Sequence, residues 1–196
     1  MLVSILIWLS GYDDLAAITL GFIPGTVGGS VIAGPGVTLL PAWLTPLTAT
    51  LVHAGVAHLA FNLVMLVFCG MMVERAIGAR LAILLYVIGA YAAAAGQWLG
   101  QPGGNVPTIG ASGAISAWVA AYALLYAERP VPAIGPIPSR VVRVIWLAIA
   151  WIGIQLLIGV AGMAGGTSIA IGAHIGGFIA GLALTRPMLR WHYRHA

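Results

Sequence analysis

Long apolar stretches constrain the fold of this chain more than any other feature. Five of them, separated by short joints rich in charge, proline or glycine, cover Thr50–Val73, Leu81–Leu99, Gly110–Ala127, Val141–Val160 and Ser168–Leu184. About 20 apolar residues suffice for a helix to cross a bilayer. Only 6% of the 196 residues are charged, against roughly 25% in soluble domains. The sequence therefore predicts an all-α, polytopic transmembrane bundle that forms a single domain over residues 1–196.

Composition excludes several other classes of protein. A disulfide scaffold needs paired cysteines, and Cys69 is the single cysteine. Disordered chains are poor in apolar residues, whereas 61% of these residues are hydrophobic. The net charge of +4 does not predict a nucleic-acid partner, because the arginines form no dense basic run.

The N-terminal quarter is harder to interpret as membrane spans. Residues 1–10 are apolar but only half a span long, and Gly11–Asp14 interrupts them. No basic residue precedes this stretch and no A-x-A site follows it, so we expect a first span that is incomplete or unusually short rather than a signal peptide. Residues 15–49 hold four prolines and predict an irregular loop at the membrane surface. With the first helix included, the prediction is six spans.

The arginines predict the topology. All eight fall in joints or ends that lie on one side of the membrane if every span crosses it: Arg75, Arg80, Arg129, Arg140, Arg143, Arg186, Arg190 and Arg194. Basic segments face the cytoplasm. We therefore expect a multi-pass membrane protein with residues 187–196 as a cytoplasmic tail. The membrane that we expect is a bacterial inner membrane.

Polar side chains inside membrane spans are costly and are functional candidates by default. In this chain they are His53, His58, Asn62, Gln97, Ser112, Ser116, Gln155 and His174. His58 and Ser112 lie near the outer ends of their spans. His174 is about two turns into the last span, or ~9 Å deep at 1.5 Å per residue. The topology thus predicts that these three residues share one depth in the outer leaflet.

Helical spacing groups the candidates further. His58 and Asn62, at i and i+4, face the same way. Two faces of small residues match each other, one with His174, Gly177 and Gly181 and the other with Ser112, Ser116 and Ala120. Small residues let helices approach closely. Packing of these two faces would bring Ser112 toward His174.

Gly110-Ala111-Ser112-Gly113 opens a helix directly after a glycine- and proline-rich loop. The N–H groups of a helix N-terminus can hold an oxyanion, and a neutral histidine can activate a serine hydroxyl. The pattern predicts a nucleophile, a base and polar donors on a third helix. Purely structural roles stay open for the same residues. Ser112 would then be a helix cap and His53 a loop anchor. His174, His58 and Asn62 would be packing or interhelical hydrogen-bonding residues.

Two other hydrolytic chemistries lack the residues that they require. The chain has no H-E-x-x-H motif, as a zinc protease of that type requires. A two-aspartate mechanism needs carboxylates in two spans, but the only aspartates are the adjacent Asp13 and Asp14. A serine mechanism is the one whose parts are all present.

Three motifs in order resemble the rhomboid family of intramembrane serine proteases. They are HAGVAHLAFN at residues 53–62, GASG at 110–113 and AHIGGFIAG at 173–181, and Glu74-x-x-x-Gly78 agrees with them. The similarity runs from about Gly21 to Arg186.

The resemblance implies a catalytic dyad without an aspartate, in which Ser112 is the nucleophile and His174 the general base. His58, Asn62 and the Ser112 N–H would form the oxyanion hole. Structural or loop-anchoring roles would fall to His53, Glu74, Gly110, Gly113, Gly177 and Gly181. The family needs no metal or cofactor and cleaves single-span membrane proteins in the lipid bilayer, near the outer end of their spans. Residues 24–50 would be its membrane-associated first loop, and the fifth span its lateral gate.

The chain departs from the family pattern at two internal places. Ser116 stands where members commonly have Tyr or Phe stacking on the base histidine, which predicts a less rigidly held His174. Leu44-Thr45 replaces a common Trp-Arg pair. Two alternatives therefore stay open. One is a catalytically inactive rhomboid-like protein that binds client transmembrane helices, and the other is a haem or metal protein that uses two of His53, His58 and His174.

Overall fold

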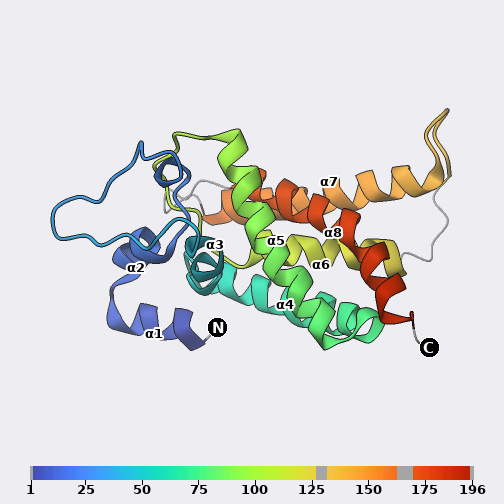
Figure 1. The fold of residues 1–196 in the computed structure, drawn as a ribbon, viewed down its shortest axis with the longest axis horizontal. Helices are drawn as coiled ribbons and strands as arrows, with labels where there is room; N and C mark the ends of the chain where they lie inside the picture. The colour runs from blue at the N-terminus through green and yellow to red at the C-terminus, as the bar shows by residue number, and fades with distance from the viewer. Residues whose placement is uncertain (1, 127–131, 163–169, 195–196) are drawn as a thin grey trace.

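The computed structural model of the chain is an elongated bundle of helices (Figure 1). It describes residues 2–126, 132–162 and 170–194, with the side chains of α7 described as far as Gly153. Within these ranges every regular element is helical. The five long helices match the five predicted stretches: α4 (Val56–Ile77), α5 (Ala79–Gly100), α6 (Ser112–Tyr126), α7 (Ser139–Gly162) and α8 (Ile171–His192).

Helix α6 lies at the centre of the bundle and contacts α4, α5, α7 and α8. Ten of its 15 residues are buried, as expected for a helix that is apolar or small all round. Among the described helices, α4 and α5 are long and apolar enough to cross a membrane, whereas α6 is apolar but shorter. Its roughly 22 Å is less than the ~30 Å of a hydrocarbon core. Its neighbours surround it, so both of its ends can lie inside the bundle.

Small residues set the distance between α6 and α8. A Cβ on Gly177 would run into the backbone oxygen of Gly113, and one on Gly181 would run into that of Ala117. The two predicted small-residue faces therefore do pack against each other. A second contact was not foreseen. Gly172 and Gly176 pack α8 equally closely against α5, where Gly96 faces both of them.

The N-terminal part contains more helix than predicted. Helix α1 (Leu2–Ser10) is followed by α2 (Asp13–Leu20), so the prediction of irregular structure from residue 15 is wrong for residues 15–20. Two aspartates in the first turn of α2 complement the positive end of its dipole, and Gly21 ends it in an extended conformation. Beyond it, only η1 (Pro24–Thr26), α3 (Thr45–Thr48) and η2 (Ala49–Leu51) interrupt a wide loop (Figure 1).

Two predicted boundaries also move. The charged joint at 74–80 shrinks to Gly78, because α4 continues through Glu74 to Ile77 and Gly78 turns the chain at a φ of +78°. The predicted tail at 187–196 is helical as far as His192. Arg190 and His192 lie in the last turn of α8, where basic side chains interact favourably with the negative end of the helix dipole. Arg129, the joint at 163–167 and the Gln155 side chain lie outside what the structure describes.

Candidate active site

The polar candidates gather at one end of the bundle, where three helices begin. Ser112 is the first residue of α6, and His58 lies in the first turn of α4. His174 lies in the first turn of α8 and not two turns in as predicted, because α8 begins at Ile171 and not at Ser168. The three helices run in the same direction, and this brings their N-termini to a common level.

Ser112 and His174 form a direct hydrogen bond. The Ser112 Oγ lies 2.8 Å from the His174 Nε2, and each residue is only 6% exposed. For the hydroxyl to donate, Nε2 must carry no proton, which requires the tautomer protonated on Nδ1. A buried serine hydroxyl that donates to a neutral imidazole is the arrangement that general-base activation needs.

The loop before α6 fixes the position of Ser112. The N–H of Gly110 donates to the carbonyl of Ala49 at 2.9 Å. Thr108 and Phe22 exchange two backbone hydrogen bonds of 2.8 and 3.0 Å. The first loop thus holds the chain that leads into α6. Gly110 has a φ of +106°, and a Cβ there would lie 2.6 Å from the His58 ring, so both backbone and space require glycine.

His58 and Asn62 supply donors on α4. The His58 Nδ1 accepts the N–H of Ala54 at 3.4 Å, so the proton of a neutral His58 lies on Nε2, the ring atom beside Gly110. The Asn62 Nδ2 donates to the His58 carbonyl at 2.9 Å, and Asn62 is 1% exposed. Since an amide nitrogen carries two hydrogens, Asn62 keeps a second donor.

His53 connects α1 to the residue before Ser112. The buried hydroxyl of Ser4 donates to the Leu51 carbonyl at 2.6 Å, and its oxygen lies 2.9 Å from the His53 Nδ1. Because the Ser4 hydrogen is used on Leu51, Nδ1 must be the donor to Ser4. The His53 Nε2 then accepts the N–H of Ala111 at 3.4 Å. This is the geometry expected of a loop anchor.

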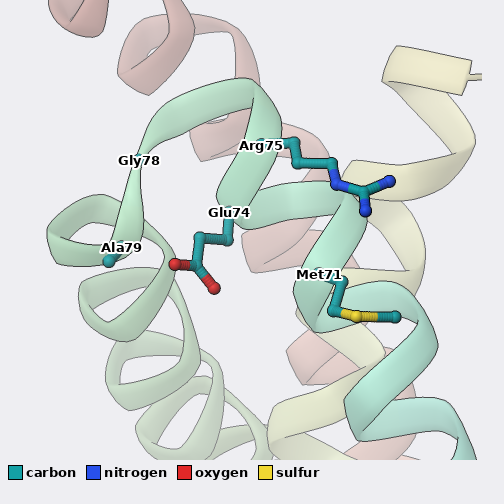
Figure 2. Close-up of a pocket in the computed structure, with 5 residues that line it drawn as sticks. All are labelled: Met71, Glu74, Arg75, Gly78 and Ala79. Carbon is teal, nitrogen blue, oxygen red and sulfur yellow. The ribbon is translucent and has the colours of Figure 1, made fainter.

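The remaining predicted residues divide between the two ends of the bundle. A Cβ on Gly113 would lie 2.7 Å from Ala93, so Gly113 packs α6 against α5. Glu74 lies at the opposite end, exposed in an open depression with Met71, Arg75, Gly78 and Ala79 (Figure 2). Within the described part of the chain its carboxylate has no hydrogen-bond or salt-bridge partner, and in Figure 2 the Arg75 side chain points away from it. Glu74 is therefore not placed with the other candidates.

Sequence reasoning missed three contributors to this end. Ser4 and Trp151 are not among the candidates that the sequence indicates, and neither is the packing of Gly172 against α5. The sequence spacing could have revealed Gly172, because Gly172-x-x-x-Gly176 is a second small-residue pattern that ends directly before Gly177-x-x-x-Gly181 begins. Ser4 and Trp151 carry no such pattern, and only their three-dimensional contacts reveal them.

Comparison with known proteins identifies the family of the chain. The family model of the Rhomboid domain matches residues 41–191, which include the three helix starts that form the site. A search of curated proteins finds no match to the chain. The chain belongs to the rhomboid family. It is therefore a membrane protein of a family whose members are usually serine proteases and act on membrane-protein substrates in the bilayer.

Proposed function

We propose that this rhomboid-family protein is an intramembrane serine endopeptidase that uses Ser112 and His174 as a catalytic dyad. The observation that carries the proposal is the 2.8 Å hydrogen bond between the Ser112 Oγ and the His174 Nε2. The pair is buried and lies in the first turns of two helices, and Ser112 belongs to the first turn of α6, whose backbone N–H groups have no acceptor within the helix.

Acylation follows from this geometry. The Ser112 Oγ attacks the carbonyl carbon of the scissile peptide bond while its proton passes to the His174 Nε2. The carbonyl oxygen becomes an oxyanion. The Ser112 N–H, the His58 Nε2–H and the free Asn62 N–H are the donors available to hold it, and each such donor contributes roughly 10²–10³-fold to the rate.

The second half of the reaction returns the protons. His174 gives its proton to the leaving amine as the C–N bond breaks, which leaves an acyl group on Ser112. A water molecule then loses a proton to His174 and attacks the acyl carbon. Hydrolysis releases the new carboxylate and restores the Ser112 hydroxyl, so no metal or cofactor is consumed or required.

The substrates we propose are single-span membrane proteins that reach the site from the lipid bilayer. Support comes from the outer surface of the bundle, where large apolar side chains are exposed on several helices, among them Val64, Ile83, Ile149 and Ile179. Such a surface is stable against lipid and unstable against water. With α1 counted as the first span, the proposed topology has six spans.

The arginines support a cytoplasmic C-terminus. The seven arginines that the structure describes lie at the end of the bundle opposite Ser112, at the α4–α5 joint, the start of α7 and the end of α8. We therefore place that end in the cytoplasm and the dyad toward the outer side of a bacterial inner membrane. An alkaline-phosphatase fusion after Ala196 should be inactive, and an active fusion would contradict this orientation.

Labelling with a fluorescent fluorophosphonate tests the dyad. The probe forms a bond between its phosphorus and an activated serine oxygen and expels fluoride. We expect wild-type protein in detergent to label, and Ser112→Ala and His174→Ala to lose the label. Ser10→Ala removes an exposed serine that bonds only within α1 and should label like wild type. Equal labelling of wild type and Ser112→Ala would contradict the proposal.

The same experiment separates the alternatives. If the protein is instead inactive and binds client helices, the folded wild-type protein will show no labelling that depends on Ser112. The haem or metal alternative needs free imidazole nitrogens, whereas both nitrogens of His53 and the Nε2 of His174 are in hydrogen bonds. A Soret band or stoichiometric metal in the purified protein would nevertheless favour that alternative.

A further inference from the structure

Trp151 brings an aromatic ring from α7 to the base of the dyad. It is only 3% exposed, although it belongs to a helix whose other tryptophan, Trp146, is 61% exposed. The centroids of the Trp151 and His174 rings are 6.4 Å apart, and the rings are inclined at 75° in an edge-to-face arrangement. Such pairs have a preferred geometry, so the indole restricts how the imidazole can turn.

Ser116 fixes the indole in this position. The Trp151 Nε1–H donates to the Ser116 Oγ at 2.7 Å. The Ser116 hydroxyl in turn donates to the carbonyl of Ser112 at 2.7 Å, one turn earlier on α6. Tryptophan has one donor and no acceptor, so this bond determines which edge of the ring faces α6. A continuous chain of hydrogen bonds therefore joins the ring to the residue that carries the nucleophile.

A second contact holds the ring from α4. Phe61 stacks on Trp151 with centroids 5.9 Å apart and an angle of 25° between the planes. Phe61 is adjacent to Asn62, the proposed oxyanion donor. The indole is thus fixed by a hydrogen bond from α6 and by stacking from α4, and it presents itself to His174 on α8.

We propose that Trp151 is a positioning residue for His174 and that Ser116 is the anchor for Trp151. The inference rests on the proposed function of Ser112 and His174. Rotation about the bond between the Cβ of a histidine and its ring has a broad, roughly two-fold profile. A fixed neighbour helps to keep Nε2 on the Ser112 Oγ, and the buried indole is such a neighbour.

Fluorophosphonate labelling kinetics test the positioning role of Trp151, because they separate the chemical step from binding of the probe. The maximal rate constant, kinact, reports transfer of the Ser112 proton to His174 as the Oγ–P bond forms and the P–F bond breaks, whereas KI reports probe binding. We expect Trp151→Leu to lower kinact about tenfold or more and to change KI less than about twofold. Trp146→Leu, the matched control on α7, should keep wild-type values of both.

A double-mutant cycle tests the anchor with milder changes. Ser116→Ala leaves the buried indole N–H without its acceptor and should lower kinact in the wild-type background. Phenylalanine keeps a ring but has no N–H, so Ser116→Ala should cost little further in a Trp151→Phe background. Thermal unfolding of every variant in detergent shows which remain folded at the assay temperature, and kinact is compared among those.

The outcomes are distinguishable. Wild-type protein that labels no faster than Ser112→Ala would overturn the proposed function, and with it the positioning role. Wild-type protein that labels normally, with the same kinact in folded Trp151→Leu and Trp146→Leu, would overturn the positioning role alone. Equal effects of Ser116→Ala in the wild-type and Trp151→Phe backgrounds would overturn the anchor role, even if Trp151→Leu failed to fold.

Discussion

The two ends of the helix bundle differ in how far their polar side chains are buried and hydrogen-bonded. At the end where α4, α6 and α8 begin, Ser4, His53, Ser112 and His174 are buried and hydrogen-bonded to one another or to the backbone. At the other end, Glu74, Arg75 and Arg80 lie at the surface, and none of them has a charged partner within the described residues. The chain thus concentrates its buried polar contacts where the proposed chemistry takes place.

This difference predicts where substitutions will matter. A buried polar group that loses its partner costs roughly 1–3 kcal/mol, because it was removed from water in the folded state. An exposed charge keeps its hydration, so its removal usually changes the free energy of unfolding by less than about 0.5 kcal/mol. Changes to the buried polar residues at the Ser112 end should therefore affect both folding and labelling, and removal of the exposed charges at the arginine end should affect neither.

The largest effect is expected where α8 approaches α6. Gly177→Val would place a branched side chain against the Gly113 backbone and the Ser116 Cβ. Because neither helix can give way, we expect a loss of about 1–3 kcal/mol in the free energy of unfolding and no detectable labelling. Gly153→Ala, at an exposed position of α7 with open space around it, is the control and should label normally. Normal labelling of Gly177→Val would contradict the observed packing.

A smaller effect, mainly on the reaction, is expected at Gly110. Gly110→Ala would strain a φ of +106° and push the His58 ring away from Ser112. Loss of one oxyanion donor should lower the labelling rate about 10²-fold. Gly36→Ala imposes a similar strain at a φ of +76°, with nothing within 4 Å, and should leave the rate unchanged. If both variants lost the same activity, backbone strain rather than His58 would be responsible.

Loss of the contact between Ser4 on α1 and His53 should have a moderate effect. Ser4→Ala leaves the His53 Nδ1–H buried without its acceptor, so we expect the free energy of unfolding to fall by about 1–3 kcal/mol. Labelling should slow by less than about tenfold, since His53 acts on Ala111 and not on Ser112 itself. Ser10→Ala on the same helix is the matched control. Denaturation in detergent compares the stabilities, and equal values for Ser4→Ala and Ser10→Ala would show that the Ser4 contact contributes nothing.

The smallest effect is expected at the arginine end. Glu74→Gln should change the free energy of unfolding by less than about 0.5 kcal/mol and leave the labelling rate within about twofold, because the carboxylate is exposed and has no partner in the described structure. The resemblance to rhomboids gave Glu74 a structural role. A marked loss of stability in Glu74→Gln would restore that role and weaken the contrast between the two ends.

Much of this arrangement could be predicted from the sequence because polar residues are so scarce in its spans. Ser112 and His174 are conspicuous in apolar stretches, and the small residues that follow each of them predicted the contact that brings them together. The N-terminus of α8 could not be predicted as well, because the glycine-rich segment before it gives no clear helix start. The predicted helix start lies three residues too early, so His174 is closer to the start of α8 than predicted.

The role of Trp151 could not be predicted, for a physical reason. A tryptophan in a membrane span is usually part of the interfacial belt or of the core, and its neighbours depend on how α7 packs. Ser116 predicted a loosely held His174, since it replaces an aromatic residue on the same helix. In the structure the ring beside His174 is that of Trp151 on α7, and the Ser116 hydroxyl accepts the hydrogen bond of its indole N–H.

Hydrolysis of a peptide bond within a bilayer tests the central claim most directly. Purified protein is reconstituted into liposomes with a single-span substrate that carries small and helix-breaking residues near the outer end of its span, and the products are identified by mass spectrometry. We predict cleavage within or at the edge of the span by wild type and by Ser10→Ala, and none by Ser112→Ala or His174→Ala. Cleavage that persists in Ser112→Ala would contradict the account.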